Sequence, residues 1–317
     1  MNVSPRLRRA SSLKAISLLI AAISFAAPAY SQNLKITLLG TGYPRPLMER
    51  FGPGVMVEAG KEKLLFDCGR GVTQRLYQIK VPFGDVTALF LTHLHSDHIV
   101  GIPDVYLTGW LLGRTTPLRV WGPEGTSDMM SHLQQAYQFD IHTRRDIDEK
   151  LPGQGAAVIA KDIEQGVIYQ NHNLKVTAFA VDHAPVKPAF GYRVDYAGHS
   201  VVLSGDTRYS ENLISFSQGT DVLIHEVIDP EAYLAGDRLF SPEMKQKVLA
   251  HHTTAVQAGK VFSQVKPRLA VFYHIVPFDA PDLIAHTRNT YSGLLEVGED
   301  LMTIDIGDKV VVHRAPK

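Results

Sequence analysis

The chain has 317 residues, of which 45% are hydrophobic and 20% charged, and its formal net charge at pH 7 is zero. This is the composition of a globular protein, long enough for one large core or two modest ones. A neutral total argues only weakly against a nucleic-acid partner, because a local basic patch can exist within it. The single cysteine, Cys68, excludes an intramolecular disulfide, and its place after an apolar run predicts a buried residue rather than a reactive thiol.

The first residues have the three-part pattern of a secretory signal peptide. A basic segment that includes Arg8 and Arg9 precedes an apolar run at 13–27, which is short for a membrane span. Ala27-Pro28-Ala29 then supplies an A-x-A cleavage site. We therefore expect a signal peptide at 1–31 and a periplasmic or secreted domain at 32–317, with no stable membrane partner after cleavage. An uncleaved anchor helix is the alternative.

The mature chain alternates short apolar runs with amphipathic stretches. In chain order we expect strands at 34–39, 54–59 and 63–66, a helix at 73–78, a strand at 88–91, a helix at 103–112, a strand at 118–121, a helix at 126–137, strands at 174–181, 190–196, 200–203 and 222–226, helices at 242–250 and 254–264, and a strand at 269–274. Strand pairs mixed with strand–helix units predict an α/β sandwich with helices on its outer faces. The loop signal at 152–155 indicates an excursion rather than a domain boundary.

Four potential metal ligands occur within six positions, directly after the strand predicted at 88–91. They are His93, His95, Asp97 and His98. Imidazole and carboxylate together suit Zn²⁺, with Mn²⁺ or Fe²⁺ as substitutes. A chance cluster of this kind on a solvated loop is improbable, so the segment predicts a metal site.

Three more residues at predicted strand exits can complete such a site: His183, Asp206 and His274. Each of them alone is more often a capping or surface residue than a ligand. Because all three follow the histidine cluster and all leave apolar strands, we expect them to be ligands.

This set of residues resembles the metallo-β-lactamase superfamily across the whole mature chain. The HxHxDH signature is matched at 93–98, and Gly40-Thr41-Gly42 and Phe66-Asp67-Cys68-Gly69 match as well. The resemblance implies a four-layer αββα sandwich that holds two zinc ions. It also implies the ligands: His93, His95 and His183 for one ion, Asp97, His98 and His274 for the other, and Asp206 between them.

Two further segments resemble one branch of that superfamily, which contains ribonuclease Z and the zinc-type arylsulfatases. The first is the opening at 39–46. The second is His252-Thr253-Thr254-Ala255, which resembles the His-Ser-Thr motif of ribonuclease Z with Thr253 in place of serine, and Glu226 resembles the glutamate that accompanies that histidine. A carboxylate beside a histidine fixes its tautomer and raises its basicity. The same segment can also cap a helix through Thr253 or Thr254. We interpret His251 as structural.

The choice of substrate rests on the signal peptide and on the short, mixed-charge stretch at 148–155. An exported protein does not meet precursor transfer RNA, and ribonuclease Z grips that RNA with a basic arm that this stretch does not provide. We therefore predict an exported dinuclear zinc hydrolase of sulfate or phosphate esters, with a small-molecule substrate, nucleic acid as the less favoured partner, and possible homodimers. The alternatives are a ribonuclease Z-type endonuclease acting at the 3′ side of transfer RNA, a lactonase or thioesterase of the same fold, and a non-catalytic periplasmic zinc-binding protein.

The residues can also be given roles in this mechanism. We expect Asp97, His252 and Glu226 to handle protons and developing charge, and Asp67 and Thr92 to hold metal ligands in orientation. Tyr43 and Arg45 are the first candidates for substrate contact, with Arg45 binding an anion. Further aromatic candidates for the pocket are Trp110, Tyr233, Phe240 and Phe278, although core packing is the better interpretation for Trp110.

Overall fold

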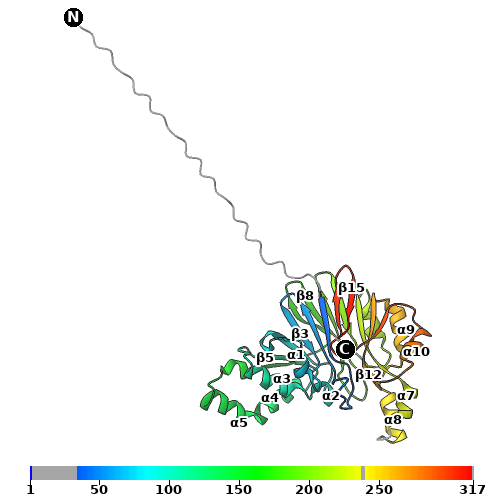
Figure 1. Ribbon diagram of the computed structural model, residues 1–317, viewed down its shortest axis with the longest axis horizontal. Helices are drawn as coiled ribbons and strands as arrows, with labels where there is room; N and C mark the ends of the chain where they lie inside the picture. Colours follow the sequence, from blue (N-terminus) through cyan, green and yellow to red (C-terminus); the bar gives the residue numbers. More distant parts are fainter. Residues whose placement is uncertain (2–33, 237–239, 316–317) are drawn as a thin grey trace. The chain divides into compact units, whose positions relative to one another are not determined.

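The computed structural model describes residue 1, residues 34–236 and residues 240–315. Apart from Met1, the predicted signal peptide lies outside these residues. The domain that begins at Ser31 contains two β-sheets with helices on their outer faces, as Figure 1 shows. The α/β sandwich predicted from the sequence is confirmed. No helix among the described residues combines the length and apolar character needed to cross a membrane.

The first sheet has the strand order β15-β14-β1-β2-β3-β4-β5-β6 and the second has the order β13-β12-β11-β10-β9-β8-β7. The strands are β1 Leu34–Gly40, β2 Gly54–Ala59, β3 Glu62–Phe66, β4 Val86–Phe90, β5 Leu118–Gly122, β6 Val158–Asp162, β7 Gly166–Asn171, β8 Leu174–Ala180, β9 Phe190–Tyr196, β10 His199–Leu203, β11 Val222–Ile228, β12 Leu269–Val276, β13 Leu295–Val297, β14 Thr303–Ile306 and β15 Val310–His313. The α-helices are α1 Val72–Gln78, α2 Ser96–Ile99, α3 Ile102–Leu111, α4 Thr126–Ala136, α5 Gln138–His142, α6 Glu211–Ser217, α7 Pro230–Gly236, α8 Pro242–Leu249, α9 Ala255–Val265 and α10 Leu283–Arg288. Short 3-10 helices lie at Phe83–Asp85 and Gly153–Ala156, and a π-helix at Thr143–Ile147.

Three apolar cores produce four layers. Because successive side chains of a strand point to opposite faces, Phe90 of β4 packs between the two sheets, whereas Leu89 packs under the helices. Trp110 of α3 joins Leu89 in the core on the outer face of the first sheet. On the outer face of the second sheet, Phe262 of α9 packs against Phe272 of β12. The order of layers is therefore helix, sheet, sheet, helix.

The sequence did not predict the short or partly exposed elements, namely β6, β7, β13, β14, β15, α2, α5, α6, α7 and α10. In β6 and β7 the side chains are at most partly buried, so no apolar run marks these strands. Strands β13, β14 and β15 have three or four residues, and the missed helices have four to seven. Elements of this length are too short to show a clear hydrophobic period.

Several parallel strands direct their carboxyl ends to one edge of the sandwich. In the first sheet β3 pairs in parallel with β4, and in the second β10 pairs in parallel with β11 and β11 with β12. Asp67 follows β3, His93 follows β4 closely, and Asp206 follows β10 closely. Ligands and catalytic groups in α/β proteins gather at this edge of a sheet.

Candidate metal centre and active site

The histidine cluster lies on the connection between β4 and α3. His95 precedes the single-turn helix α2, which contains Asp97 and His98. The amide of Cys68 donates a hydrogen bond to the His98 carbonyl (2.7 Å). A Cβ atom on Gly69 would lie 2.5 Å from the Asp97 carbonyl oxygen, so a glycine is required there. The segment after β3 thus holds the segment after β4 by direct backbone contact.

Asp206 lies at the centre of the predicted ligands. Its Oδ2 atom is 3.9 Å from Nε2 of both His93 and His183. The same oxygen is 3.4 Å from Nε2 of both His98 and His274. One carboxylate oxygen therefore faces the ligands predicted for the first ion and those predicted for the second.

All seven predicted ligands come together at this place. Nε2 of His183 lies 3.3 Å from Nδ1 of His95, and Nε2 of His274 lies 3.3 Å from Oδ2 of Asp97. The groups with mutually close ligand atoms include His93, His95 and His183; Asp97, His98 and His274; and His93, His98 and Asp206. The first two groups have the membership that the family resemblance implied.

His274 reaches this cluster through an irregularity in β12. Both His274 and Glu226 were expected at strand ends, but β12 continues to Val276 and β11 to Ile228. In the parallel pair, Glu226 is opposite Tyr273 and Val227 is opposite Ile275, so His274 is an extra residue with a φ of 46°. A bulge of this kind redirects a side chain and is common beside active sites.

Asp67 and Thr92 orient two of the histidines. His98 Nδ1 lies 2.8 Å from Asp67 Oδ2, which leaves Nε2 directed at Asp206. Thr92 donates to Asp67 from its amide (2.8 Å) and from its hydroxyl (2.9 Å to Oδ2). Because that hydroxyl is a donor to Asp67, it accepts from His93 Nδ1 at 3.0 Å. Both residues occupy the orienting positions that the sequence suggested.

The cluster fits a divalent metal site. Among the described residues, Nε2 of His93, Nε2 of His98 and Oδ1 of Asp206 are buried without a hydrogen-bond partner. Buried polar atoms without partners are costly, and bound cations would satisfy them. Imidazole nitrogens with carboxylates are a donor set typical of zinc.

The pKa shifts of three side chains in the cluster also support a metal site. Burial lowers the pKa of His93 well below its usual value, which keeps the ring neutral. For His98 burial has the same effect, but the carboxylates of Asp206 and Asp97 outweigh it and raise the pKa well above normal. Burial disfavours the charged form of Asp206, but the surrounding histidines hold its pKa well below normal. A neutral His93 ring and an ionised Asp206 carboxylate are the forms in which these side chains bind a metal ion.

Glu226 and His252 form a buried pair beside the metal cluster. Nδ1 of His252 lies 3.2 Å from Oε1 of Glu226, and the same oxygen accepts the amides of Thr207 (3.2 Å) and Thr253 (3.0 Å). Burial lowers the pKa of His252, but Glu226, Asp206 and Asp97 outweigh it and raise the pKa to about 8. The pairing leaves Nε2 of His252 for a substrate oxygen.

The two helix-capping candidates, Thr253 and Thr254, have different roles in the structure. Thr254 is the N-cap of α9 and forms a capping box with Gln257. Thr253 instead donates its hydroxyl to the Thr207 carbonyl (2.6 Å). The segment at 252–255 therefore both starts a helix and ties His252 to the loop that carries Asp206.

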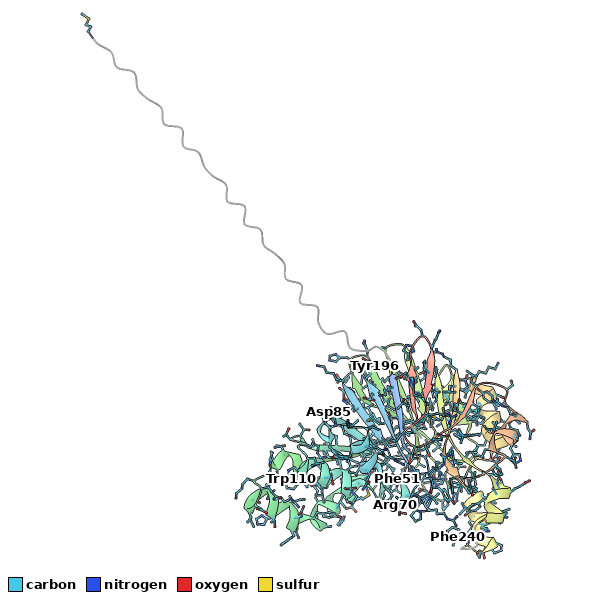
Figure 2. All side chains as sticks on the ribbon, in the orientation of Figure 1. Phe51, Arg70, Asp85, Trp110, Tyr196 and Phe240 are labelled. Carbon is cyan, nitrogen blue, oxygen red and sulfur yellow. The ribbon has the colours of Figure 1, made fainter. Side chains whose placement is uncertain are left out.

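A cavity of about 510 Å³ opens onto the cluster. Its lining residues are Tyr43, Pro44, Arg45, Pro46, His95, Ser96, Asp97, Asp206, Tyr233, Phe240, Val248, His251, His252, His274 and Val276. Tyr43 and Arg45 thus lie where a substrate would bind. Trp110 does not: it is in the core and donates Nε1 to the Pro152 carbonyl, and Figure 2 shows it far from Phe240. Phe278 lines a separate hollow with Glu49 and Arg50.

Two residues near the site were not among the functional candidates that the sequence suggested. His251, interpreted as structural, lines the cavity, and its carbonyl accepts from Nδ1 of the ligand His183 (3.0 Å). Asp300 accepts the amides of Thr41 (2.9 Å) and Phe51 (2.8 Å), and so fixes both ends of the loop that carries Tyr43 and Arg45. The doubled histidine at 251–252 could have signalled the first; the second depends on a contact between distant parts of the chain.

Known proteins are similar to this chain in sequence and in fold. A family model described as "Anti-Pycsar protein Apyc1" matches residues 34–252. The chain is 32% identical to ribonuclease Z of Mycolicibacterium gilvum, with 86% of this chain and 96% of the relative covered, and 34% identical to ribonuclease Z of Mycobacterium avium, with 86% and 98% covered. Among solved structures, the metallo-β-lactamase fold protein YhfI of Bacillus subtilis has a TM-score of 0.65 at 20% identity (86% and 99% covered), and the short form of human tRNase Z a TM-score of 0.61 at 24% identity (85% and 98% covered).

The described fold, the clustered ligands and the length of these matches agree with one another. The chain therefore belongs to the metallo-β-lactamase superfamily, in the branch of ribonuclease Z, and is a metal-dependent hydrolase of ester bonds.

Proposed function

We propose that this protein is a phosphodiesterase of the ribonuclease Z type, which uses two zinc ions to cleave phosphodiester bonds of nucleotides. The observation that carries the proposal is the position of Asp206 Oδ2 between two sets of histidines, beside the Glu226–His252 pair. The sequence left sulfate and phosphate esters both open and placed nucleic acid behind small-molecule esters. The relatives named ribonuclease Z support phosphate rather than sulfate as the group attacked, and they support nucleotides as substrates.

The residues of the chain have distinct tasks in this reaction. Bound zinc supplies Lewis acidity and a water of lowered pKa. Asp206 and the six other predicted ligands would hold the metal ions beside the cavity. Protonated His252 donates from Nε2 to an oxygen of the phosphoryl group as negative charge develops there, and Glu226 keeps the ring in that orientation. Asp97, which lines the cavity, is positioned to take the proton that the attacking water loses and to pass it to the departing oxygen.

The segment at 138–149, which contains α5 and the π-helix, supports a substrate smaller than a folded transfer RNA. Its cations are matched by neighbouring acids: Arg144 pairs with Asp140 (2.9 Å), and Arg145 with Asp146 (2.6 Å). Paired charges on one surface offer little net attraction to a phosphate backbone. We therefore place nucleotide diesters and single-stranded RNA ends ahead of precursor transfer RNA. The homodimer considered from the sequence stays a prediction.

Cleavage of RNA tests the proposal. Zinc-loaded protein is incubated with a 5′-labelled single-stranded RNA and with a precursor transfer RNA that has a 3′ extension. We expect cleavage of the first, a lower rate on the second, and loss of both in His252→Ala. Absence of cleavage of either RNA, with bound zinc verified, would contradict the ribonuclease assignment.

We also propose that the protein is exported, with residues 1–31 removed. The support is the basic, apolar and small-residue order of that segment. Fractionation of expressing cells, followed by N-terminal sequencing, tests it. Recovery outside the cytoplasm with a new N-terminus near residue 30 is expected, whereas cytoplasmic protein that begins at Met1 would show that the segment does not act as a signal.

A further inference from the structure

The lining of the active-site cavity includes a group of apolar side chains as well as predicted metal ligands. Tyr233 comes from α7, Val248 from α8, and Phe240 lies just before α8. Tyr43 completes this apolar wall from the loop after β1, and it shares a small apolar cluster with Tyr233. Figure 2 shows Phe240 at the α7–α8 pair, away from the helices that hold Trp110.

This wall is held in place by specific contacts. Asp229, buried before α7, accepts the amide of Ala232 (2.9 Å) and lies 3.1 Å from Nδ1 of His286 on α10. Lys245 of α8 donates its ammonium to the Leu234 carbonyl on α7 (2.7 Å). Ser241 caps α8 by accepting the amide of Met244 (3.2 Å). Both helices are therefore anchored, and the wall they form is preorganised for a ligand.

The cavity is lined by two kinds of side chain. Some are the carboxylates and imidazoles that would hold metal and phosphate, and others are aromatic and aliphatic side chains. Phe240 is 45% exposed, although a phenyl ring in water is unfavourable. A cavity of about 510 Å³ has room for one nucleotide unit.

We propose that this wall, formed by Tyr43, Tyr233, Phe240 and Val248, is a subsite that stacks the base of a nucleotide attached to the scissile phosphate. The inference rests on the proposed phosphodiesterase function. It adds the part of the substrate by which the protein would distinguish a nucleotide ester from a simple ester. An aromatic platform of this kind accepts any base, because every base has a flat π face. Arg45, which lines this cavity and shares a neighbouring hollow with Tyr43 and Tyr233, adds a cation near the stacked ring.

Two diesters with the same leaving group test the subsite. Thymidine 5′-(4-nitrophenyl phosphate) carries a base, whereas methyl 4-nitrophenyl phosphate does not. We expect kcat/KM of the zinc-loaded protein to be about 5- to 100-fold higher for the thymidine ester, as base stacking on an aromatic side chain provides. Phe240→Ala should lose most of that ratio. Met244→Ala is the matched control, since Met244 lies nearby on α8, is 48% exposed and does not line the cavity.

Binding separates failure of the subsite from failure of the proposed function. The dissociation constant of thymidine 5′-monophosphate should rise about tenfold in Phe240→Ala and stay unchanged in Met244→Ala. Equal kcat/KM values for the two diesters in the unaltered protein, or equal dissociation constants in all three proteins, would overturn the subsite. If neither diester is cleaved but Phe240→Ala weakens nucleotide binding as expected, the subsite stands and the phosphodiesterase function is overturned.

Discussion

Oδ2 of Asp67 lies 2.8 Å from Nδ1 of His98, and both side chains are buried. This contact fixes the ring so that its other nitrogen faces Asp206 at 3.4 Å. The partner of a metal-ligating histidine affects both its orientation and its basicity. We therefore expect Asp67, which is not itself a predicted ligand, to affect how tightly the site holds a metal ion.

Replacement of Asp67 should weaken metal binding. Asp67→Asn keeps the size of the side chain but removes its charge, and we expect zinc affinity to fall about 10- to 100-fold in a chelator competition assay. Asp305→Asn is the matched control, because Asp305 also lies beside a histidine (His313, 3.1 Å) but on the exposed surface. Equal zinc affinities for the two variants would show that Asp67 does not orient the site.

Replacement of Glu226 should slow the reaction without removing the metal. Glu226→Gln can keep an oxygen that accepts the amides of Thr207 and Thr253 but loses the charge beside His252. We expect kcat to fall about 10- to 100-fold with KM nearly constant, and a fall of about 100- to 1,000-fold for His252→Ala. Steady-state kinetics and metal analysis check this, with the exposed Glu243→Gln as control. A loss of zinc in Glu226→Gln would indicate a structural role instead.

Zinc should stabilise the fold in a pH-dependent way. An ion bound only by the folded chain, present at about 1,000 times its dissociation constant, adds about 4 kcal/mol, which raises Tm by roughly 10 °C. Below about pH 6 protons compete for the imidazoles, so the increase should shrink as the pH falls. Thermal unfolding with zinc and with a chelator measures the difference. The same Tm under both conditions at pH 7.5 would contradict a metal site here.

Cys68 should be inert in the folded protein. Burial raises the pKa of its thiol well above the usual value, and the charge of Asp67 raises it further. Since the thiolate is the reactive form, iodoacetamide at about pH 8.5 should modify Cys68 only after unfolding. Mass spectrometry of native and denatured samples measures the modification of Cys68. Equal labelling rates in both samples would show that Cys68 is not protected by burial.

The sequence was sufficient for the parts of the fold and site that depend on local pattern. The long apolar strands and the amphipathic helix α9 show their periods within a few residues. The cluster at 93–98 is contiguous, so its chemistry was visible before any folding was known. The pairing of Glu226 with His252 followed from resemblance rather than from local pattern.

The features that the sequence did not predict depend on contacts between segments that are far apart in the chain. The bulge at His274 exists only in the register of β12 against β11. The aromatic wall needs α7 and α8 to pack beside the loop that carries Tyr43, and α7 is too short to show a helical period. Asp300 reaches Thr41 across 259 positions of the chain, a distance at which no local pattern operates.

The most direct test of the account compares two esters with the same leaving group and different centres of attack. Zinc-loaded protein is assayed with bis(4-nitrophenyl) phosphate and with 4-nitrophenyl sulfate, for the unaltered protein, His95→Ala and His252→Ala. A phosphodiester preference that both substitutions abolish is the predicted result. Preference for the sulfate would contradict the phosphodiesterase assignment, and full activity in His95→Ala would contradict the metal centre on which the account is built.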